Sequence, residues 1–232
     1  GCIDSDLDGY SDPDPNSLWS TNPWDLVDGA DAFSNDNTQW HDTDSDSFGD
    51  NWADMSWGVL RNGTGIGEFV ENATRPDFCP TEWGNSTEDR FGCVDSDGDG
   101  WSNPDMNWTY DPVPCQSDET HCADAFPNDP TQHEDSDGDG WGDDQTQSNG
   151  DHCLNTQGSS YQDRNGCPDS DGDGYSDADA TWLAHPLGAA DAFPNMPSQW
   201  HDTDGDSHGD EYSFTVGNDG LRVCESGDAF IN

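Results

Sequence analysis

Aspartate recurs at every second position in six short loops of the 232-residue chain. In residues 135–143 the first, third, fifth and ninth positions are Asp135, Asp137, Asp139 and Asp143, and position 6 is a glycine. Four such carboxylates, together with the main-chain carbonyl of position 7, can surround a hard divalent cation with oxygen atoms. One such loop would be weak evidence, because a solvated turn can have the same sequence. Six loops with one spacing predict calcium binding.

The six loops fall into two classes, which we call leading and trailing loops. Leading loops follow the pattern Cys-x-Asp-Ser-Asp-x-Asp-Gly-aromatic-Ser, and trailing loops lack the cysteine. The predicted ligands of the leading loops, including the position-7 carbonyl, are Asp4, Asp6, Asp8, Tyr10 and Asp12; Asp95, Asp97, Asp99, Trp101 and Asn103; and Asp169, Asp171, Asp173, Tyr175 and Asp177. Those of the trailing loops are Asp42, Asp44, Asp46, Phe48 and Asp50; Asp135, Asp137, Asp139, Trp141 and Asp143; and Asp202, Asp204, Asp206, His208 and Asp210. We expect six or more calcium ions.

Further oxygen ligands must lie outside the loops, because none has the bidentate Glu that completes an EF-hand at position 12. Each leading loop offers one more carboxylate two residues after position 9, at Asp14, Asp105 and Asp179. Each trailing loop is preceded, always by eleven residues, by the aspartate of an Asp-Ala-Phe sequence, namely Asp31, Asp124 and Asp191. These three are candidate ligands. The alternative is that they only cap the turn of the Asp-Ala-Phe segment.

Position 6 of the loop makes a sharp turn, for which glycine has the least steric cost. Four loops have glycine there, whereas Ser47 and Ser207 occupy it in the other two. We therefore expect these two trailing loops to bind calcium more weakly.

The order of these motifs divides the chain into three repeat units. Each unit contains a leading loop, an Asp-Ala-Phe sequence and a trailing loop, followed by a variable segment. The predicted units are residues 1–91, which carry a hairpin insertion; residues 92–165, which carry an insertion with two cysteines; and residues 166–232, which end with a hairpin.

The elements that position these loops are predicted to be mostly irregular. Pro, Gly, Asp and Asn are too frequent for helices, and no apolar period of 3.6 residues is present. Residues 57–70 and 212–223 alternate loosely around Asn-Gly and Asn-Asp-Gly sequences, which favours two short β-hairpins. Residues 145–152 form a shorter turn segment with its own Asn-Gly sequence. The sequence therefore predicts a tandem repeat wrapped around calcium, with little or no helix.

The composition excludes an ordinary hydrophobic core. Only 29% of the residues are apolar, and 51 acidic residues against five basic ones give a net charge of −46. Such a chain needs bound cations to become compact, and it lacks the basic patches with which proteins bind nucleic acid or anionic membranes. An acidic disordered tail is the alternative, but eleven Trp, nine Phe and five Tyr argue against it.

Eight cysteines and four Asn-x-Ser/Thr sequons indicate an oxidising, glycosylating environment, extracellular or at the cell surface. The predicted glycosylation sites are Asn62, Asn72, Asn85 and Asn107. Spacing alone pairs Cys79 with Cys93, Cys153 with Cys167, and Cys115 with Cys122. Joining Asn232 to Gly1 would recreate the Asn-Gly-Cys sequence that opens a leading loop, so Cys224 is predicted to bond to Cys2 of the next copy. The alternative is that Cys2 and Cys224 pair within one chain or stay free.

The loop sequences resemble those of a known family. Residues 126–143 resemble the C-type half of thrombospondin type 3 repeats, and the leading Cys-x-Asp-Ser-Asp-Gly-Asp-Gly segments resemble the N-type half. Microbial surface proteins carry similar Asp-Ala-Phe-Pro-Asn repeats. The resemblance implies an extracellular stalk whose backbone wraps around rows of calcium ions and is cross-linked by disulfides. The long insertions, the hairpins and the large side chains of Trp101 and Trp141 depart from the family pattern.

These observations predict a rigid structural rod that forms a head-to-tail filament or tandem array. A cell-surface adhesin stalk, or another calcium-dependent binding module, is the alternative, and an acidic calcium buffer is a third interpretation. The position-7 aromatics either pack between ion layers or form a platform for carbohydrate. The sequence contains no recognisable catalytic motif. A calcium ion fully surrounded by oxygen ligands also lacks the free coordination position that metal catalysis needs, so we expect no enzyme activity.

Overall fold

The structure is a computed structural model. It describes residues 3–13, 30–61, 63–106 and 123–211, together with the backbone of residues 213–216 and 222–226. The chain divides into two compact units. The first comprises Gly1–Tyr110 and Thr120–Pro130, and the second comprises Asp111–Glu119 and Thr131–Asn232.

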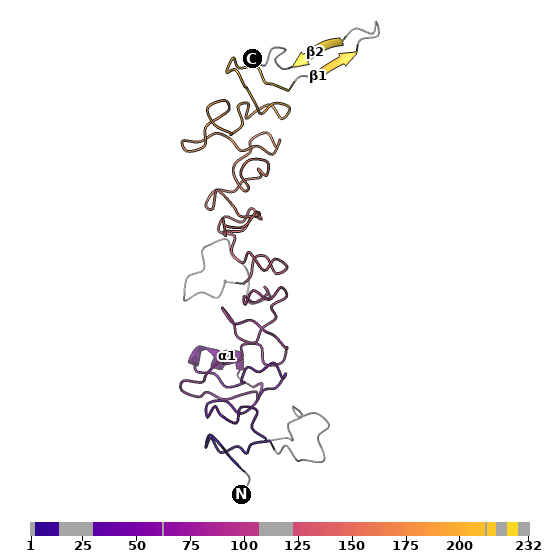
Figure 1. Cartoon of the computed structure of the whole chain (residues 1–232). Coiled ribbons are helices and arrows are strands. Elements are labelled where there is room, and N and C mark those ends of the chain that lie inside the picture. The colour runs from indigo at the N-terminus through magenta and orange to yellow at the C-terminus, as the bar shows by residue number, and fades with distance from the viewer. Residues whose placement is uncertain are drawn as a thin grey trace. The chain divides into compact units, whose positions relative to one another are not determined.

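Most of the described chain is irregular, as the sequence predicts (Figure 1). Within the described ranges, regular structure is limited to the 3-10 helix η1, Met55–Trp57, the α-helix α1, Gly58–Arg61, and the strands β1, Ser213–Val216, and β2, Arg222–Ser226. The physical reason lies in the aspartates, whose side chains accept hydrogen bonds from main-chain N–H groups a few residues away. These local bonds compete with helix and sheet hydrogen bonding.

The hairpin predicted for residues 212–223 is confirmed. Strands β1 and β2 pair in antiparallel fashion, with Phe214 opposite Cys224 and Val216 opposite Arg222. The register shifts between Ser213 and Phe214, which is the signature of a β-bulge.

The hairpin predicted for residues 57–70 is wrong, because the chain forms η1 and α1 there instead. Asp54 caps η1, with its Oδ1 accepting a hydrogen bond from the Ser56 N–H at 2.8 Å. Such an N-terminal cap stabilises the helical turn. The chain then returns to Trp52, whose carbonyl accepts a hydrogen bond from the Val70 N–H at 3.0 Å.

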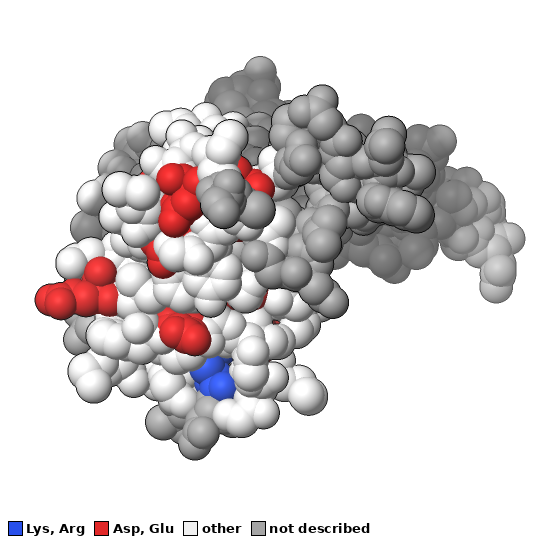
Figure 2. All heavy atoms as spheres, turned by 90° about the horizontal axis from the view of Figure 1, so that it is seen from below, with Lys and Arg blue, Asp and Glu red and all other residues white. Residues whose placement is uncertain are grey.

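The interior of the described chain is polar. Its largest fully buried side chains are mainly amides and carboxylates: Gln39, Gln132, Gln199, Asn51, Asp31, Asp50, Asp77, Asp124, Asp151, Asp191, Cys93 and Cys167. On the face seen in Figure 2, acidic side chains form separate small areas between other residues. Part of the large negative charge of the chain therefore lies inside it.

A buried glutamine fastens the ends of each trailing loop together. The Gln132 side chain accepts a hydrogen bond from the Asp144 N–H at 2.9 Å and donates one to the Asp144 carbonyl at 3.1 Å. Gln39 makes the same pair of bonds with Asn51, and Gln199 makes it with Glu211. This clasp explains why glutamine recurs at the same place in all three units.

Two of the predicted disulfides, Cys79–Cys93 and Cys153–Cys167, are present. Cys2, Cys115 and Cys122 lie outside the described residues, as does the side chain of Cys224. The link from Cys224 to the next copy therefore stays a prediction. In the described part of the chain, no helix has the length and apolar character needed to cross a membrane.

Candidate metal centres

The aspartates at positions 1 and 5 accept hydrogen bonds from main-chain N–H groups of their own loop. In the 135–143 loop, Asp135 accepts hydrogen bonds from the N–H groups of Gly138 at 2.7 Å and Gly140 at 2.9 Å. Asp139 accepts one from the Trp141 N–H at 2.9 Å. Equivalent bonds are made by position 1 and position 5 of the other five loops. The alternating sequence therefore folds the loop locally.

Position 9 closes the loop. Asp143 accepts hydrogen bonds from both the N–H and the hydroxyl of Ser136, and its own N–H donates to the Glu134 carbonyl at 2.9 Å. The same two bonds join Asp12 to Ser5, Asp50 to Thr43, Asp177 to Ser170, and Asp210 to Thr203. Asn103 accepts from the Ser96 N–H and donates its amide N–H to the Ser96 hydroxyl. The predicted ligand at position 9 therefore holds the loop shut through its side chain.

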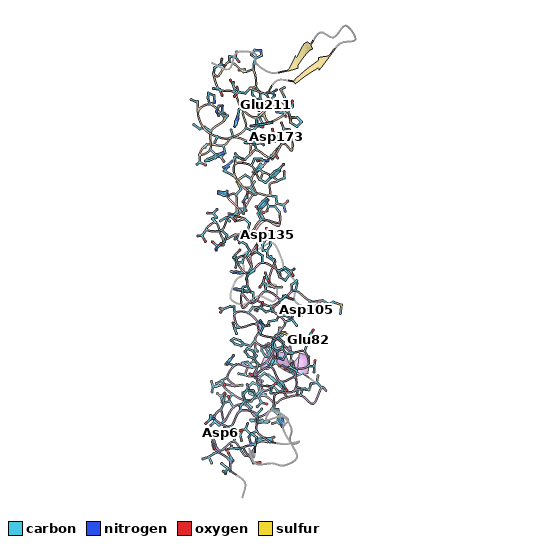
Figure 3. All side chains as sticks on the ribbon, turned by 45° about the vertical axis from the view of Figure 1, so that its right-hand side comes forward. Asp6, Glu82, Asp105, Asp135, Asp173 and Glu211 are labelled. Carbon is cyan, nitrogen blue, oxygen red and sulfur yellow. A yellow bond between two sulfur atoms is a disulfide. The ribbon has the colours of Figure 1, made fainter. Side chains whose placement is uncertain are left out.

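Positions 1, 3 and 5 bring carboxylate oxygens together. In at least five loops, one oxygen from each of three aspartates lies within 4.8 Å of the other two. These groups are Asp4, Asp6 and Asp8; Asp42, Asp44 and Asp46; Asp95, Asp97 and Asp99; Asp135, Asp137 and Asp139; and Asp169, Asp171 and Asp173. Figure 3 labels Asp6, Asp135 and Asp173, one residue from each of three groups. Such groups could hold metal ions.

A distant aspartate joins each leading loop. Asp124 is buried, and its N–H donates to the carbonyl of Ser102, position 8 of the 95–103 loop, at 2.9 Å. Its Oδ1 accepts a hydrogen bond from the Phe126 N–H at 2.7 Å. Its Oδ2 is buried without a hydrogen-bond partner, as is the Oδ2 atom of Asp97. One oxygen therefore caps the turn, and the other is unsatisfied.

The other leading loops repeat this arrangement. Asp31 and Asp191 are buried, and their N–H groups donate to Ser11 and Ser176, the position-8 residues of their loops, at 2.9 Å each. In each case one oxygen caps the Asp-Ala-Phe turn and Oδ2 lacks a partner. Both interpretations of these aspartates, ligand and cap, thus have an oxygen atom available.

The trailing loops use a different distant aspartate, which the sequence reasoning missed. Asp151 is 1% exposed, and its N–H donates to the carbonyl of Gly142, position 8 of the 135–143 loop, at 2.7 Å. Its Oδ1 accepts a hydrogen bond from the Cys153 N–H at 2.6 Å. Asp77 stands in the same relation to the 42–50 loop, with bonds to Gly49 at 2.8 Å and Cys79 at 2.7 Å. The available signal was the Asp-x-Cys sequence, which occurs at the end of both units.

The disulfide-closed segments also reach the trailing sites. The Gly158 N–H donates to Asp139 Oδ2 at 2.9 Å, and the Gly84 N–H donates to Asp46 Oδ2 at 3.2 Å. Gly166 lies so close to Asp151 that a Cβ atom would come within 2.1 Å of the carboxylate, at a φ of +70°. Only glycine fits at this position.

The distant aspartates are costly to charge in the absence of a cation. Burial, together with repulsion from nearby loop carboxylates, raises the pKa of Asp124, Asp151 and Asp191 to about 7. The same causes raise the pKa of Asp31 to about 6 and that of Asp77 to about 8. A cation bound among these oxygens would remove both the repulsion and the unsatisfied acceptors.

The sixth loop, residues 202–210, has the local geometry but different surroundings. Asp202 accepts hydrogen bonds from Gly205 at 2.7 Å and from Ser207 at 2.9 Å, as position 1 does elsewhere. Asp204 and Asp206 are exposed, whereas the aspartates at positions 3 and 5 of the other five loops are half-buried or buried. Among the residues that the structure describes, no distant aspartate donates to the carbonyl of Gly209.

The carboxylates predicted two residues beyond position 9 are paired with arginine. Arg90 donates to Asp105 at 2.6 Å, and Arg164 donates to Asp179 at 2.7 Å. Each arginine also donates to the position-8 serine, Ser102 or Ser176. These ion pairs hold the chain that leads into the loop against the chain that leaves it. Asp14 lies outside the described residues.

The aromatic residues at position 7 pack against other rings. Tyr10 stacks on Trp40 with centroids 5.1 Å apart, and Tyr175 stacks on Trp200 at 5.3 Å. Phe48 stacks on Phe91 at 5.8 Å. These ring contacts provide apolar packing in an otherwise polar interior.

Two of the four predicted glycosylation sites can be placed. Asn72 and Asn85 are both exposed, as a glycan acceptor must be. Asn62 and Asn107 lie outside the described residues.

Comparisons of the chain with protein-family models, with curated proteins and with solved structures find no match.

Proposed function

We propose that this chain is an extracellular, calcium-binding structural protein whose irregular backbone is held in shape by ions bound in its aspartate loops, in the manner of thrombospondin type 3 repeats. One observation carries the proposal. In five loops, three aspartates bring carboxylate oxygens within 4.8 Å of one another, and a buried distant aspartate is hydrogen-bonded to position 8 of the same loop. Every position-3 aspartate of these loops and four of the five distant aspartates have a buried oxygen atom without a partner. Buried acceptors of this kind normally have a partner.

Calcium fits this donor set better than the other common divalent cations. The side-chain oxygens of these groups are all carboxylate oxygens, and they come from irregular loops and from distant segments. Calcium accepts six to eight oxygens in variable geometry, whereas magnesium requires a near-ideal octahedron and retains water. Zinc prefers nitrogen and sulfur ligands.

The amount of stabilisation available from binding supports a structural role. A ligand present at about twenty times its Kd contributes roughly 1.8 kcal/mol per site. Five such sites contribute about 9 kcal/mol, which is comparable to the whole stability of a typical domain. The chain has few buried apolar side chains within its described part, so ion binding would supply the largest share of its stability.

Removal of calcium tests the proposal. The purified chain, with its disulfides intact, is studied by small-angle scattering and thermal unfolding in 2 mM calcium and again after excess EGTA. We expect the radius of gyration to rise and the unfolding transition to weaken or disappear, with recovery when calcium but not magnesium is restored. Dimensions and melting behaviour that are the same in EGTA and in calcium would refute a structural role for the ion.

A further inference from the structure

One buried arginine, Arg61, lies beside the candidate metal centre of the 42–50 loop, whereas Arg90 and Arg164 link chain segments through ion pairs. Arg61, the last residue of α1, is only 7% exposed. Its Nη2 donates to the main-chain carbonyl of Asp77, the distant aspartate of the 42–50 loop. The guanidinium carbon lies 5.8 Å from the centre of the Trp52 ring. A buried guanidinium needs acidic partners to compensate for its lost hydration.

The charge of Arg61 acts on the carboxylates of this centre. Its Nη1 is buried and makes no hydrogen bond. Burial lowers the pKa of Arg61, and the charges of Asp77 and Asp50 oppose that effect. A Cβ atom added at Gly92 would lie 2.3 Å from Asp77 Oδ1 and 3.0 Å from Asp46 Oδ2, so the carboxylates of Asp77 and the loop lie close together. The guanidinium is thus a permanent positive charge beside a cluster that otherwise consists of aspartates.

The 135–143 loop shows that such a site forms without an arginine. Asp151 is held by its N–H to Gly142 and by the Cys153 N–H, and Asp77 is held by the two equivalent bonds at closely similar distances. Arg164, in the segment closed by the Cys153–Cys167 disulfide, donates to Ser176 and Asp179. Because the two shared bonds already fix the distant aspartate, the bond from Arg61 is not needed to place Asp77. Its distinctive contribution is charge.

We propose that Arg61 sets the calcium affinity of the 42–50 site, acting as a built-in counter-charge that weakens cation binding and stabilises the carboxylates when the ion has left. This inference rests on the proposed function, that the loops bind calcium. A fixed positive charge repels a divalent ion at short range and offsets the mutual repulsion of the aspartates in its absence. The 42–50 site therefore releases calcium before the 135–143 site and changes its shape less.

Stopped-flow calcium release from the full chain into a fluorescent chelator tests this inference. The release phase of the 42–50 site is identified by its loss in Asp44→Asn. Arg61→Gln removes the charge and retains an N–H donor for the Asp77 carbonyl, and we expect it to slow this phase on the order of tenfold. Arg61→Lys retains the charge and should leave the rate within about twofold of the wild type. In EGTA, Arg61→Gln should also melt at a lower temperature than Arg61→Lys.

Two other outcomes would overturn this inference, and a third would refute the proposed function. Unchanged or faster release in Arg61→Gln would overturn the counter-charge and would indicate a positioning role. An Arg61→Gln chain that does not fold even in saturating calcium would overturn it as well, because the arginine would then be a structural requirement. A wild-type chain that releases no calcium would refute the proposed function itself, which distinguishes the two failures.

Discussion

The loops 135–143 and 202–210 have nearly the same sequence and the same internal hydrogen bonds, but their surroundings differ. Both hold position 1 to the main chain, close through position 9 and are fastened by a buried glutamine. The first loop is also contacted by Asp151, which precedes Cys153, and by the Gly158 N–H of the disulfide-closed segment. The second has exposed aspartates at positions 3 and 5, and Arg222 stands two residues before Cys224, where Asp151 stands before Cys153.

This difference distinguishes the backbone conformation of a loop from its ability to enclose a cation. The alternating aspartates determine the backbone of the loop, because their hydrogen bonds are local. A closed cage additionally needs a carboxylate from another part of the chain. We therefore expect the number of motifs in the sequence to be an upper limit on the number of strong cation sites, and the distant aspartates to determine which loops reach that strength.

Removal of the distant aspartate should have the largest effect. Asp151→Asn keeps an oxygen that can accept from the Cys153 N–H but removes the carboxylate from the 135–143 site. We expect calcium affinity at this site to fall about 100-fold, because calcium affinity in such loops follows the number of charged ligands. Native mass spectrometry across a calcium titration would show one fewer tightly bound ion.

Asp144→Asn provides the control for this change. Asp144 follows the same loop, but its carboxylate accepts hydrogen bonds from exposed Thr146. The number of tightly bound ions should stay at the wild-type value. An equal loss in the two variants would show that acidity in the neighbourhood, rather than the carboxylate of Asp151, determines binding.

The converse change should make the 202–210 loop more like the 135–143 loop. Arg222→Asp places a carboxylate at the Asp-x-Cys position, and we expect one additional tightly bound calcium ion, with an affinity gain of about tenfold or more. Arg222→Asn, which removes the positive charge without adding a ligand, should give a smaller gain. A wild-type chain that already binds six ions tightly would contradict the comparison. Asp228, which begins a fourth Asp-Ala-Phe sequence, would then be the candidate distant aspartate for this loop.

The sequence predicts the local parts of this molecule well. Loop positions 1, 3 and 5, two disulfides and the β1–β2 hairpin depend on spacing or turn chemistry that the sequence displays. The Asp-Ala-Phe aspartates could also be identified, because their interval to the next loop is constant. The repeated units and the thrombospondin type 3 resemblance stay predictions.

The remaining features depend on contacts between segments that vary in length. Asp77 lies 27 residues after Asp50, but Asp151 lies eight residues after Asp143, so no fixed interval marks them. The pairing of Asp105 with Arg90 likewise needs both segments in place. The helical turn η1 depends on the cap at Asp54, which lies outside the alternating segment 57–70 from which a hairpin was expected.

The smallest expected effect concerns position 6, where the two loops differ by Gly140 and Ser207. Both residues have positive φ, +93° and +72° respectively, a conformation that costs a serine roughly 1 kcal/mol more than a glycine. Ser207→Gly should therefore raise the free energy of unfolding by about 1 kcal/mol in saturating calcium, and Gly140→Ser should lower it by a similar amount. Urea unfolding measures both. If both substitutions shift the free energy in the same direction, backbone strain at position 6 does not distinguish the loops, and their difference lies entirely in the distant carboxylate.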